Sequence, residues 1–425
     1  MRLVHTSDWH LGRQTSRHSR DSDFDAVLDE IISITQEARP DLIVHSGDLF
    51  DTYRPATRDI MRAMQALDAL QAIAPTVVVA GNHDSPALFD LLNYLCGSDL
   101  RTGTKRLTFV GSPGHGTYGK VLDFDAGGGV QRIRLGVLPF IHANRFLGLS
   151  SEPGTTAEDY STGLRGIQAD LMSRLSDGYD SDRDVLVFAA HLFVAGAVPS
   201  YTERALDITE TYATDPADMP AVSYGALGHI HKPQAVPGVK FPAWYAGSPL
   251  QLDFGEAGES KSILVVDAAP GRPTRISPRP LTSGSRLAHF HGTLQDLAQR
   301  AHQYTDMFLK ATITSEKPAL RLAQSVADAV PGAMVIEVVE ECEGAQVTVL
   351  DRSTAAVSEP ELAESFRTYL SETGTPGHVA DDVLTALVDL LSCPDELPPC
   401  PAESLLEAAL HNPWTAQSPQ PQETA

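Results

Sequence analysis

The chain has 425 residues, of which 42% are hydrophobic, and this allows two or three domains with ordinary buried cores. No apolar stretch reaches the length needed to cross a bilayer, and the N-terminus lacks a secretory pattern, so we expect a cytoplasmic protein with no membrane partner. Four widely spaced cysteines without a C-x-x-C pair argue against a disulfide framework and a zinc knuckle.

The net charge of −23 is unevenly distributed along the chain. Residues 316–425 contain 19 acidic and 4 basic side chains, so this end is a poor surface for nucleic acid. The first 315 residues carry only −8, and two bound divalent cations would offset half of that charge. A phosphodiester substrate is therefore compatible with the first part of the chain.

Short apolar runs alternate with helical patterns over the first 90 residues. L-V-H, L-I-V-H-S and T-V-V-V-A are brief, apolar and closed by Gly or Asp, which predicts buried strands. Apolar residues recur with helical spacing between these runs, and this order predicts a mostly parallel sheet covered by helices. Further strands are expected in D-V-L-V-F-A-A and V-S-Y-G-A-L, and we assign residues 1–280 to this α/β domain.

The pattern changes after the Pro/Arg-rich stretch G-R-P-T-R-I-S-P-R-P. Residues 281–352 predict a small α+β unit, with strands at 287–291, 307–314 and 334–339 and helices at 294–304 and 319–330. Residues 353–393 predict two amphipathic helices, the first opening with an S-x-x-E capping box. These helices have no core of their own, so they need another surface to pack on. The Pro/Gln/Ser-rich residues 394–425 are expected to be disordered.

Polar side chains follow each predicted strand of the 1–280 domain. Side chains at such exits meet in one crevice of an α/β sheet, and a preceding glycine lets the backbone turn sharply and approach its neighbours. The residues at these exits are Asp8, His10, Asp48, Asn82, His83, Asp84, His191, His229 and His231.

The chemical types at these exits suit a pair of metal ions. Two aspartates, an asparagine and four histidines offer oxygen and imidazole ligands, which suit Mn²⁺, Fe²⁺ or Zn²⁺. Seven ligands are natural for two ions that share a carboxylate, and we expect Asp48 to be the bridge. His83, with Asp84 beside it, is expected to protonate or stabilise the leaving oxygen.

Each of these pieces has another interpretation when it is taken alone. A D-x-H is often a surface turn, a G-D is common, and a histidine after a strand is often a cap or a packed residue. Their occurrence at five successive strand exits favours the metal site. His5 and His45 lie inside predicted strands and are expected to be sheet residues instead.

The strings D-W-H, G-D-L-F-D, G-N-H-D and G-H-I-H, together with His191, resemble the motifs of the calcineurin-like metallophosphoesterase superfamily. The resemblance implies a metallophosphoesterase α/β sandwich with a small α+β capping domain and C-terminal helices. It implies two divalent ions, with Mn²⁺ the expected metal. It implies that one ion is held by Asp8, His10, Asp48 and His231, and the other by Asp48, Asn82, His191 and His229. It also implies that His83 acts on the transition state.

Longer strings such as H-T-S-D-W-H-L-G and G-H-I-H-K-P-Q resemble the DNA nucleases of this superfamily. That resemblance implies 3′–5′ degradation of duplex ends and cleavage of single strands or hairpins. It further implies a DNA-binding capping domain, tail helices that dock on a coiled-coil ATPase, and a homodimer. Some relatives have a histidine after G-D-L-F that affects exonuclease action; Asp51 stands there in this chain, which leaves the balance of the two activities open.

Several alternatives remain open at this point. Arg13, Arg17 and Arg20 follow the first ligand pair and are candidates for contacts with DNA phosphates, with a solvated loop as the other interpretation. The tail helices can dock on a partner or fold back on their own domain. A small-molecule or cyclic-nucleotide phosphodiesterase shares every metal ligand but has no need of a capping domain. A non-catalytic DNA-end scaffold with structural metals is a further alternative, against which His83 speaks.

Overall fold

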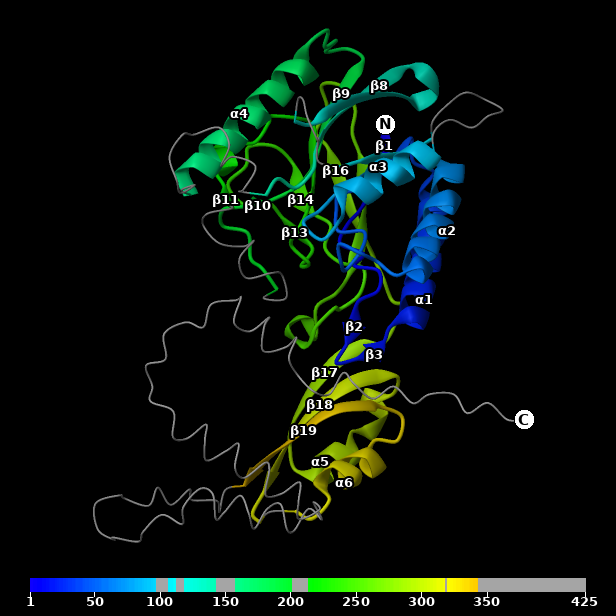
Figure 1. Ribbon diagram of the computed structural model, residues 1–425, viewed down its shortest axis with the longest axis vertical. Coiled ribbons are helices and arrows are strands. Elements are labelled where there is room, and N and C mark those ends of the chain that lie inside the picture. Colours follow the sequence, from blue (N-terminus) through cyan, green and yellow to red (C-terminus); the bar gives the residue numbers. More distant parts are fainter. Residues whose placement is uncertain (97–105, 112–117, 143–156, 201–212, 318, 343–425) are drawn as a thin grey trace, which may run out of the picture. The chain divides into compact units, whose positions relative to one another are not determined.

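The computed structural model describes residues 1–96, 106–111, 118–142, 157–200, 213–317 and 319–342 (Figure 1). The chain divides into two compact units, residues 1–345 and 346–425, and the second lies outside the described residues. The predicted tail helices at 353–393 and the predicted disordered end at 394–425 therefore also lie outside them. Across the described ranges, no helix combines the length and the apolar character that crossing a membrane requires.

The first sheet has six strands in the order β16-β15-β1-β4-β5-β6. They are β1 (Arg2–Thr6), β4 (Leu42–His45), β5 (Thr76–Val79), β6 (Leu107–Val110), β15 (Ser262–Asp267) and β16 (Arg275–Pro280). Strands β1, β4, β5 and β6 are parallel, whereas β15 and β16 join antiparallel. One face is covered by α1 (Asp21–Ala38), α2 (Thr57–Ile73) and α3 (Pro86–Leu95), because their apolar residues recur every three or four positions.

The second sheet also has six strands, in the order β13-β14-β12-β9-β8-β7. They are β7 (Lys120–Ala126), β8 (Gln131–Leu138), β9 (Asp184–His191), β12 (Tyr224–Gly228), β13 (Gln234–Ala235) and β14 (Ala243–Tyr245). Helix α4 (Ala157–Ser176) packs on its outer face. The inner faces of the two sheets share one core, in which Leu3 and Val77 of the first sheet meet Ile133 and Val187 of the second.

The predicted α/β sandwich is confirmed, and so is the parallel pairing of the first three predicted strands, β1, β4 and β5, under helices. The structure has two mixed sheets, each with antiparallel strands at an edge. An apolar run such as D-V-L-V-F-A-A predicts burial on both faces of a strand. It does not reveal whether a helix or a second sheet covers each face, so the pairing of two sheets could not be predicted from it.

A small α+β unit follows the sandwich. It consists of β17 (Arg286–Gly292), α5 (Leu294–Gln299), the 3₁₀ turn η6 (Ala301–Tyr304), β18 (Met307–Ser315), α6 (Leu322–Ala329) and β19 (Met334–Cys342). The three strands are parallel and pack with the helices around a core of their own (Figure 1). The predicted elements of this small α+β unit are found within a few residues, except that the helix predicted at 294–304 is divided at Arg300.

The remaining elements are short. They are β2 (Gln14–Thr15), β3 (His18–Ser19), β10 (Phe193–Val194), β11 (Ala213–Thr214) and the 3₁₀ turns η1 (Gly127–Gly129), η4 (Pro216–Asp218) and η5 (Phe254–Glu256). The register of the long strands matters more for the site. Thr6 of β1 lies beside His45 of β4, and Gly228 of β12 lies beside His191 of β9. Polar residues that directly follow these strands are therefore brought together in pairs.

Candidate metal centre

The backbone at the strand exits is held in an unusual conformation. Asp8 (φ 52°), His10 (φ 47°), Asp48 (φ 54°) and His229 (φ 105°) all have positive φ. Non-glycine residues rarely adopt this region, and those that do are concentrated at functional sites because the surrounding structure must hold them there. The backbone N–H of Asp8 donates to the carbonyl of Gly47 at 2.9 Å, and that of His10 donates to the carbonyl of Asp48 at 3.0 Å. The segments that follow β1 and β4 are thus hydrogen-bonded to each other.

Glycines allow the exits to approach one another closely. A Cβ atom on Gly47, which has φ 117°, would lie 2.0 Å from Nδ1 of His191. A Cβ atom on Gly81 would lie 2.0 Å from Oδ1 of Asp48. Real Cβ atoms do not approach other atoms so closely, so the site requires glycine at both positions. This is the close approach that the sequence predicted.

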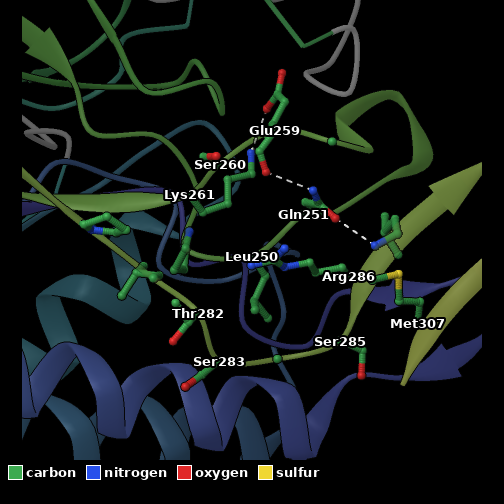
Figure 2. A pocket seen from close by; sticks show the side chains of 16 residues that line it. Leu250, Gln251, Glu259, Ser260, Lys261, Thr282, Ser283, Ser285, Arg286 and Met307 are labelled. Carbon is green, nitrogen blue, oxygen red and sulfur yellow. Dashed lines mark hydrogen bonds and ion pairs between the residues drawn. The ribbon is translucent and has the colours of Figure 1, made fainter. Parts of the chain in front are cut away.

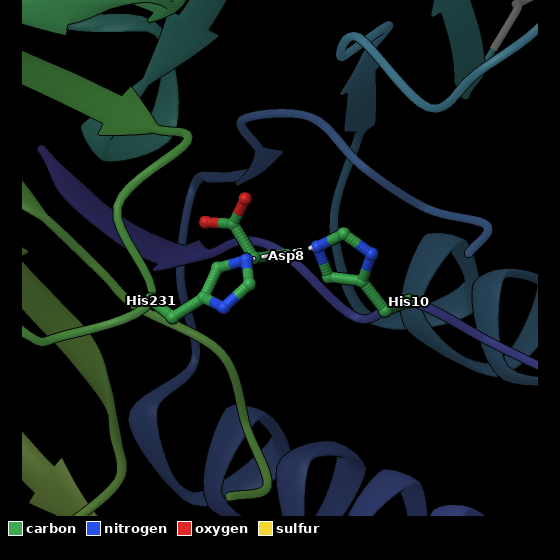
Figure 3. Close-up of side chains that lie close together, drawn as sticks. All are labelled: Asp8, His10 and His231. Atoms are coloured by element: carbon green, nitrogen blue, oxygen red, sulfur yellow. Dashed lines mark hydrogen bonds between the residues drawn. The ribbon is translucent and has the colours of Figure 1, made fainter. Parts of the chain in front are cut away.

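One group of predicted ligands consists of Asp8, His10 and His231. Each offers a ligand atom within 4.8 Å of the others, and all three residues are buried. Nε2 of His10 lies 3.1 Å from Nε2 of His231. Figure 3 shows the two rings directed at each other, with the carboxylate of Asp8 beside the ring of His231. The backbone N–H of His229 donates to this carboxylate at 3.1 Å, which holds Asp8 in place.

A second group consists of Asn82, His191 and His229. Oδ1 of Asn82 lies 2.9 Å from Nε2 of His191 and 3.1 Å from Nδ1 of His229. Nδ1 of His191 donates to the carbonyl of Ser46 at 3.0 Å, so in the neutral form of the ring Nε2 presents a lone pair. Two acceptor atoms that face each other at this distance need a proton or a cation between them.

Asp48 stands between the two groups. Its Oδ2 lies 3.4 Å from Nε2 of His10 and 3.5 Å from Nε2 of His191. Its Oδ1 accepts a hydrogen bond of 2.9 Å from the backbone N–H of His83. A single carboxylate is therefore within reach of both clusters, as a bridging ligand must be.

The electrostatics of the centre favour added positive charge. Burial raises the pKa of Asp8 to about 6. Burial alone lowers the pKa of His191, but the nearby charge of Asp48 and its hydrogen bond outweigh this and raise the pKa to about 9. Among the described residues, no lysine or arginine forms an ion pair with either aspartate. The buried oxygen and imidazole donors therefore fit two divalent cations of the Mn²⁺, Fe²⁺ or Zn²⁺ type.

His83 lies at the edge of the centre and is partly buried. Its Nδ1 lies 2.6 Å from the carbonyl oxygen of Asp51, which can only accept, so Nδ1 carries the hydrogen and Nε2 remains for proton transfer. The His83 ring meets the His10 ring edge to face, with 4.7 Å between centroids. The carboxylate of Asp51 is turned elsewhere, 3.5 Å from Nδ1 of His10 and 3.3 Å from the guanidinium of Arg13.

The expectation that Asp84 acts in catalysis beside His83 does not agree with the structure. Its buried carboxylate accepts hydrogen bonds from the backbone N–H groups of Gly81 at 2.9 Å, Phe50 at 3.0 Å and Leu49 at 3.1 Å. Burial, followed by the charge of Asp48, raises the pKa of Asp84 to about 7. Asp84 thus joins the loops that carry Asp48 and Asn82. The sequence places it next to His83 but does not show where its side chain points.

The three candidate DNA-contacting arginines differ in their exposure. Arg17 is exposed and Arg13 is partly exposed, so both are accessible to a ligand. Arg20 is 2% exposed, and its guanidinium donates to Asp23, to the hydroxyl of Thr15, and to the carbonyls of Gln251 and Ser285. The expectation that Arg20 contacts phosphates therefore does not fit. Its partners lie up to 265 positions away, and no local pattern indicates them.

Sequence reasoning missed Glu256, which is fully buried beside the first group of ligands. Its Oε1 accepts from Nδ1 of His231 at 3.1 Å, and its Oε2 lies 2.6 Å from Nζ of Lys261. Burial alone raises the pKa of Glu256, but Lys261 and His231 together hold it well below the usual range. Glu256 follows the string Y-A-G-S-P-L-Q by five positions, and nothing in its immediate sequence marks it.

The sandwich and its paired ligand groups define a metal-dependent phosphoesterase, and comparison with known proteins agrees with this class. The model of the family "Calcineurin-like phosphoesterase" matches residues 1–233, and the chain belongs to this family. Three similar curated proteins are each named as the SbcD subunit of the nuclease SbcCD. That of Bacillus subtilis (strain 168) is 31% identical over 293 residues, covering 68% of this chain and 71% of the relative.

The other two relatives are more distant. The Escherichia coli (strain K12) protein is 28% identical over 335 residues, covering 72% of this chain and 75% of its own length. The Rhodobacter capsulatus protein is 29% identical over 293 residues, covering 66% of this chain and 69% of its own length.

Proposed function

We propose that the protein is a two-metal DNA nuclease of the SbcD type. It degrades duplex ends from 3′ to 5′, cuts single strands and hairpins, and acts in DNA end processing, repair and recombination. The observation that carries this proposal is the position of Asp48 between two buried clusters of donors, within 3.5 Å of a histidine nitrogen from each. The three nuclease-named relatives support DNA as the substrate of this phosphoesterase.

The proposed ligand sets share Asp48. One ion is held by Asp8, His10, Asp48 and His231, and the other by Asp48, Asn82, His191 and His229. When bound, such a pair polarises the phosphodiester and lowers the pKa of the attacking water. Mn²⁺ is the proposed metal because the resemblance to the family implies it, and the oxygen and imidazole donors without a thiolate are compatible with it.

The protein's own groups have separate tasks in this reaction. In its doubly protonated form, His83 keeps one proton on Nδ1 against the carbonyl of Asp51 and gives the other, on Nε2, to the leaving oxygen, which leaves the ring neutral. Asp84 keeps the ligand loops together through three backbone N–H groups. The exposed Arg17 and the partly exposed Arg13 position the DNA backbone, and Asp51 influences the balance of exonuclease and endonuclease action through its contact with Arg13.

The proposed partners are DNA, an SbcC-type coiled-coil ATPase and a second copy of the chain. The names of the relatives describe one component of a complex, which supports the ATPase partner. Leu91, Tyr94 and Leu95 are 51%, 82% and 66% exposed along one side of α3, and this apolar stripe supports a homodimer. We place the protein in the cytoplasm, with the small α+β unit as the DNA-capping domain and the tail helices as the docking segment for the ATPase.

The most informative test compares the wild type with His83→Ala on linear duplex DNA in Mn²⁺. We expect the wild type to degrade the DNA, and we expect His83→Ala to retain both ions while it loses cleavage. Asp48→Ala should lose both ions and serves as the control for the metal site. Rapid hydrolysis of cyclic nucleotides with DNA untouched would favour the small-molecule phosphodiesterase instead. If the wild type and His83→Ala bound DNA equally and neither cleaved it, the result would favour a non-catalytic DNA-end scaffold.

A further inference from the structure

Glu256 lies directly behind the ring of a predicted metal ligand. One carboxylate oxygen accepts from Nδ1 of His231 at 3.1 Å, on the side of the ring opposite to the Nε2 that faces His10. The other oxygen accepts from the backbone N–H of Leu252 at 3.2 Å and lies 2.6 Å from Nζ of Lys261. Glu256 is fully buried, so each of these contacts is shielded from water.

We propose that Glu256 is a positioning residue for the metal centre, which holds His231 with its hydrogen on Nδ1 so that Nε2 faces the cations. This inference rests on the proposed function, since it concerns the ions of that same site. A neutral imidazole carries its single hydrogen on either nitrogen, and a fixed acceptor at Nδ1 selects the form whose Nε2 can bind a metal. A carboxylate in this place also makes the ring a stronger ligand.

Lys261 completes the arrangement. Its side chain is 5% exposed, and its Nζ donates to the backbone carbonyl of His231 at 3.0 Å while it balances the charge of Glu256. The backbone N–H of Ser248 donates to the same carbonyl at 3.0 Å. The ring of His231 is therefore held by Glu256 and its backbone by Lys261 and Ser248. A side chain needed only for packing would not require this buried pair of opposite charges.

The turn that carries Glu256 is held by contacts with the small α+β unit. Phe254, at the other end of η5, packs with Leu287 of β17 and Phe308 of β18. Nε2 of His289 lies 3.1 Å from the carbonyl of Phe254 and can donate to it. Gln251, labelled in Figure 2, provides a second contact in the same region, because its Oε1 accepts from the backbone N–H of Leu287 at 2.7 Å. The turn that carries Glu256 is thus packed on the small α+β unit and hydrogen-bonded to it.

His191 provides a comparison within the same site. Its Nδ1 donates to a neutral backbone carbonyl, that of Ser46, at 3.0 Å. His231 donates to an ionised carboxylate instead, and hydrogen bonds to charged acceptors are about twice as strong as neutral ones. Removal of the acceptor should therefore affect the ion held by His231 and leave the ion held by His191 in place.

Titration calorimetry of the full-length, metal-free protein with Mn²⁺ tests this inference. We expect two binding steps in the wild type, and in Glu256→Ala a loss of about 10- to 100-fold in the affinity of one step only. Glu256→Gln keeps an acceptor for Nδ1 without the charge, and its affinity should lie between the two. Glu259→Gln is the matched control. Glu259 also contacts Lys261, at 3.0 Å, but it is not hydrogen-bonded to His231 in the structure. We therefore expect both binding steps of Glu259→Gln to match those of the wild type.

The spectrum of the bound metal gives a second readout, which a merely structural role would not alter. At two equivalents of Mn²⁺, the wild type should give the electron paramagnetic resonance signal of a coupled pair, and Glu256→Ala that of an isolated ion. Two steps of wild-type affinity in both Glu256 variants would overturn the inference and leave the nuclease proposal intact. If Glu256→Ala does not fold, Glu256→Gln provides the test. Two Mn²⁺-binding steps of wild-type affinity in Glu256→Gln would then overturn the inference. A wild type that binds fewer than two ions would overturn the proposed function, and the inference with it.

Discussion

Replacement of Arg20 by alanine should destabilise the protein and should not act through DNA binding. The Arg20 side chain is 1% exposed and pairs with Asp23, whose side chain is 11% exposed. Its guanidinium also satisfies the carbonyls of Gln251 and Ser285, at 3.0 Å and 2.8 Å, and lies over the ring of Phe308. It therefore joins the start of α1 to the segment that leads into the small α+β unit.

The magnitude follows from what the substitution leaves behind. Breaking a buried ion pair by removing one partner costs about 3–5 kcal/mol, because the remaining charge stays buried. Asp23 keeps hydrogen bonds of 2.9 Å from the backbone N–H and the hydroxyl of Ser285, which reduces that penalty. We therefore expect a loss of about 3 kcal/mol in the free energy of unfolding of Arg20→Ala.

Urea unfolding followed by circular dichroism measures this loss, and Arg17→Ala is the matched control. Arg17 is exposed three positions earlier, so its removal should change stability by less than about 0.5 kcal/mol. It should instead weaken DNA binding and make that binding less dependent on salt. The reasoning would be refuted if Arg20→Ala unfolded like the wild type and bound DNA more weakly.

Three further predictions concern the site and the assembly. Gly81→Ala should abolish metal binding in calorimetry, because the new Cβ would lie 2.0 Å from Oδ1 of Asp48. In nuclease assays with saturating Mn²⁺, His83→Ala should cut at least about 100-fold more slowly, which is the lower range for a lost proton donor; a rate near that of the wild type would remove His83 from the mechanism. Tyr94→Asp should convert a dimer into a monomer in light scattering, because Tyr94 is 82% exposed on the apolar side of α3.

The meeting of the proposed metal ligands could be predicted because each lies at or just after the end of a buried strand. Once β1 and β4 pair in register, with Thr6 beside His45, Asp8 and Asp48 must approach each other. The small α+β unit was predictable for a similar reason, since its strands and helices each carry their own apolar period. Local sequence is sufficient to predict a feature when residues close together along the chain determine it.

The supporting residues could not be predicted in the same way. Asp84 binds backbone N–H groups 34 and 35 positions away, and Arg20 binds a carbonyl 265 positions away. Backbone partners leave no trace in residue type, so neither a motif nor a period indicates them. Glu256 was missed because its partner, His231, lies 25 positions earlier across a turn whose course the sequence does not fix.

Crystals grown with Mn²⁺ and measured at the manganese absorption edge give the most direct test of the two-metal centre. Two anomalous peaks roughly 3.5–4 Å apart are expected, one between Asp8, His10 and His231 and the other beside Asn82, His191 and His229, with Asp48 touching both. A single peak, or peaks away from His191 and His231, would contradict it.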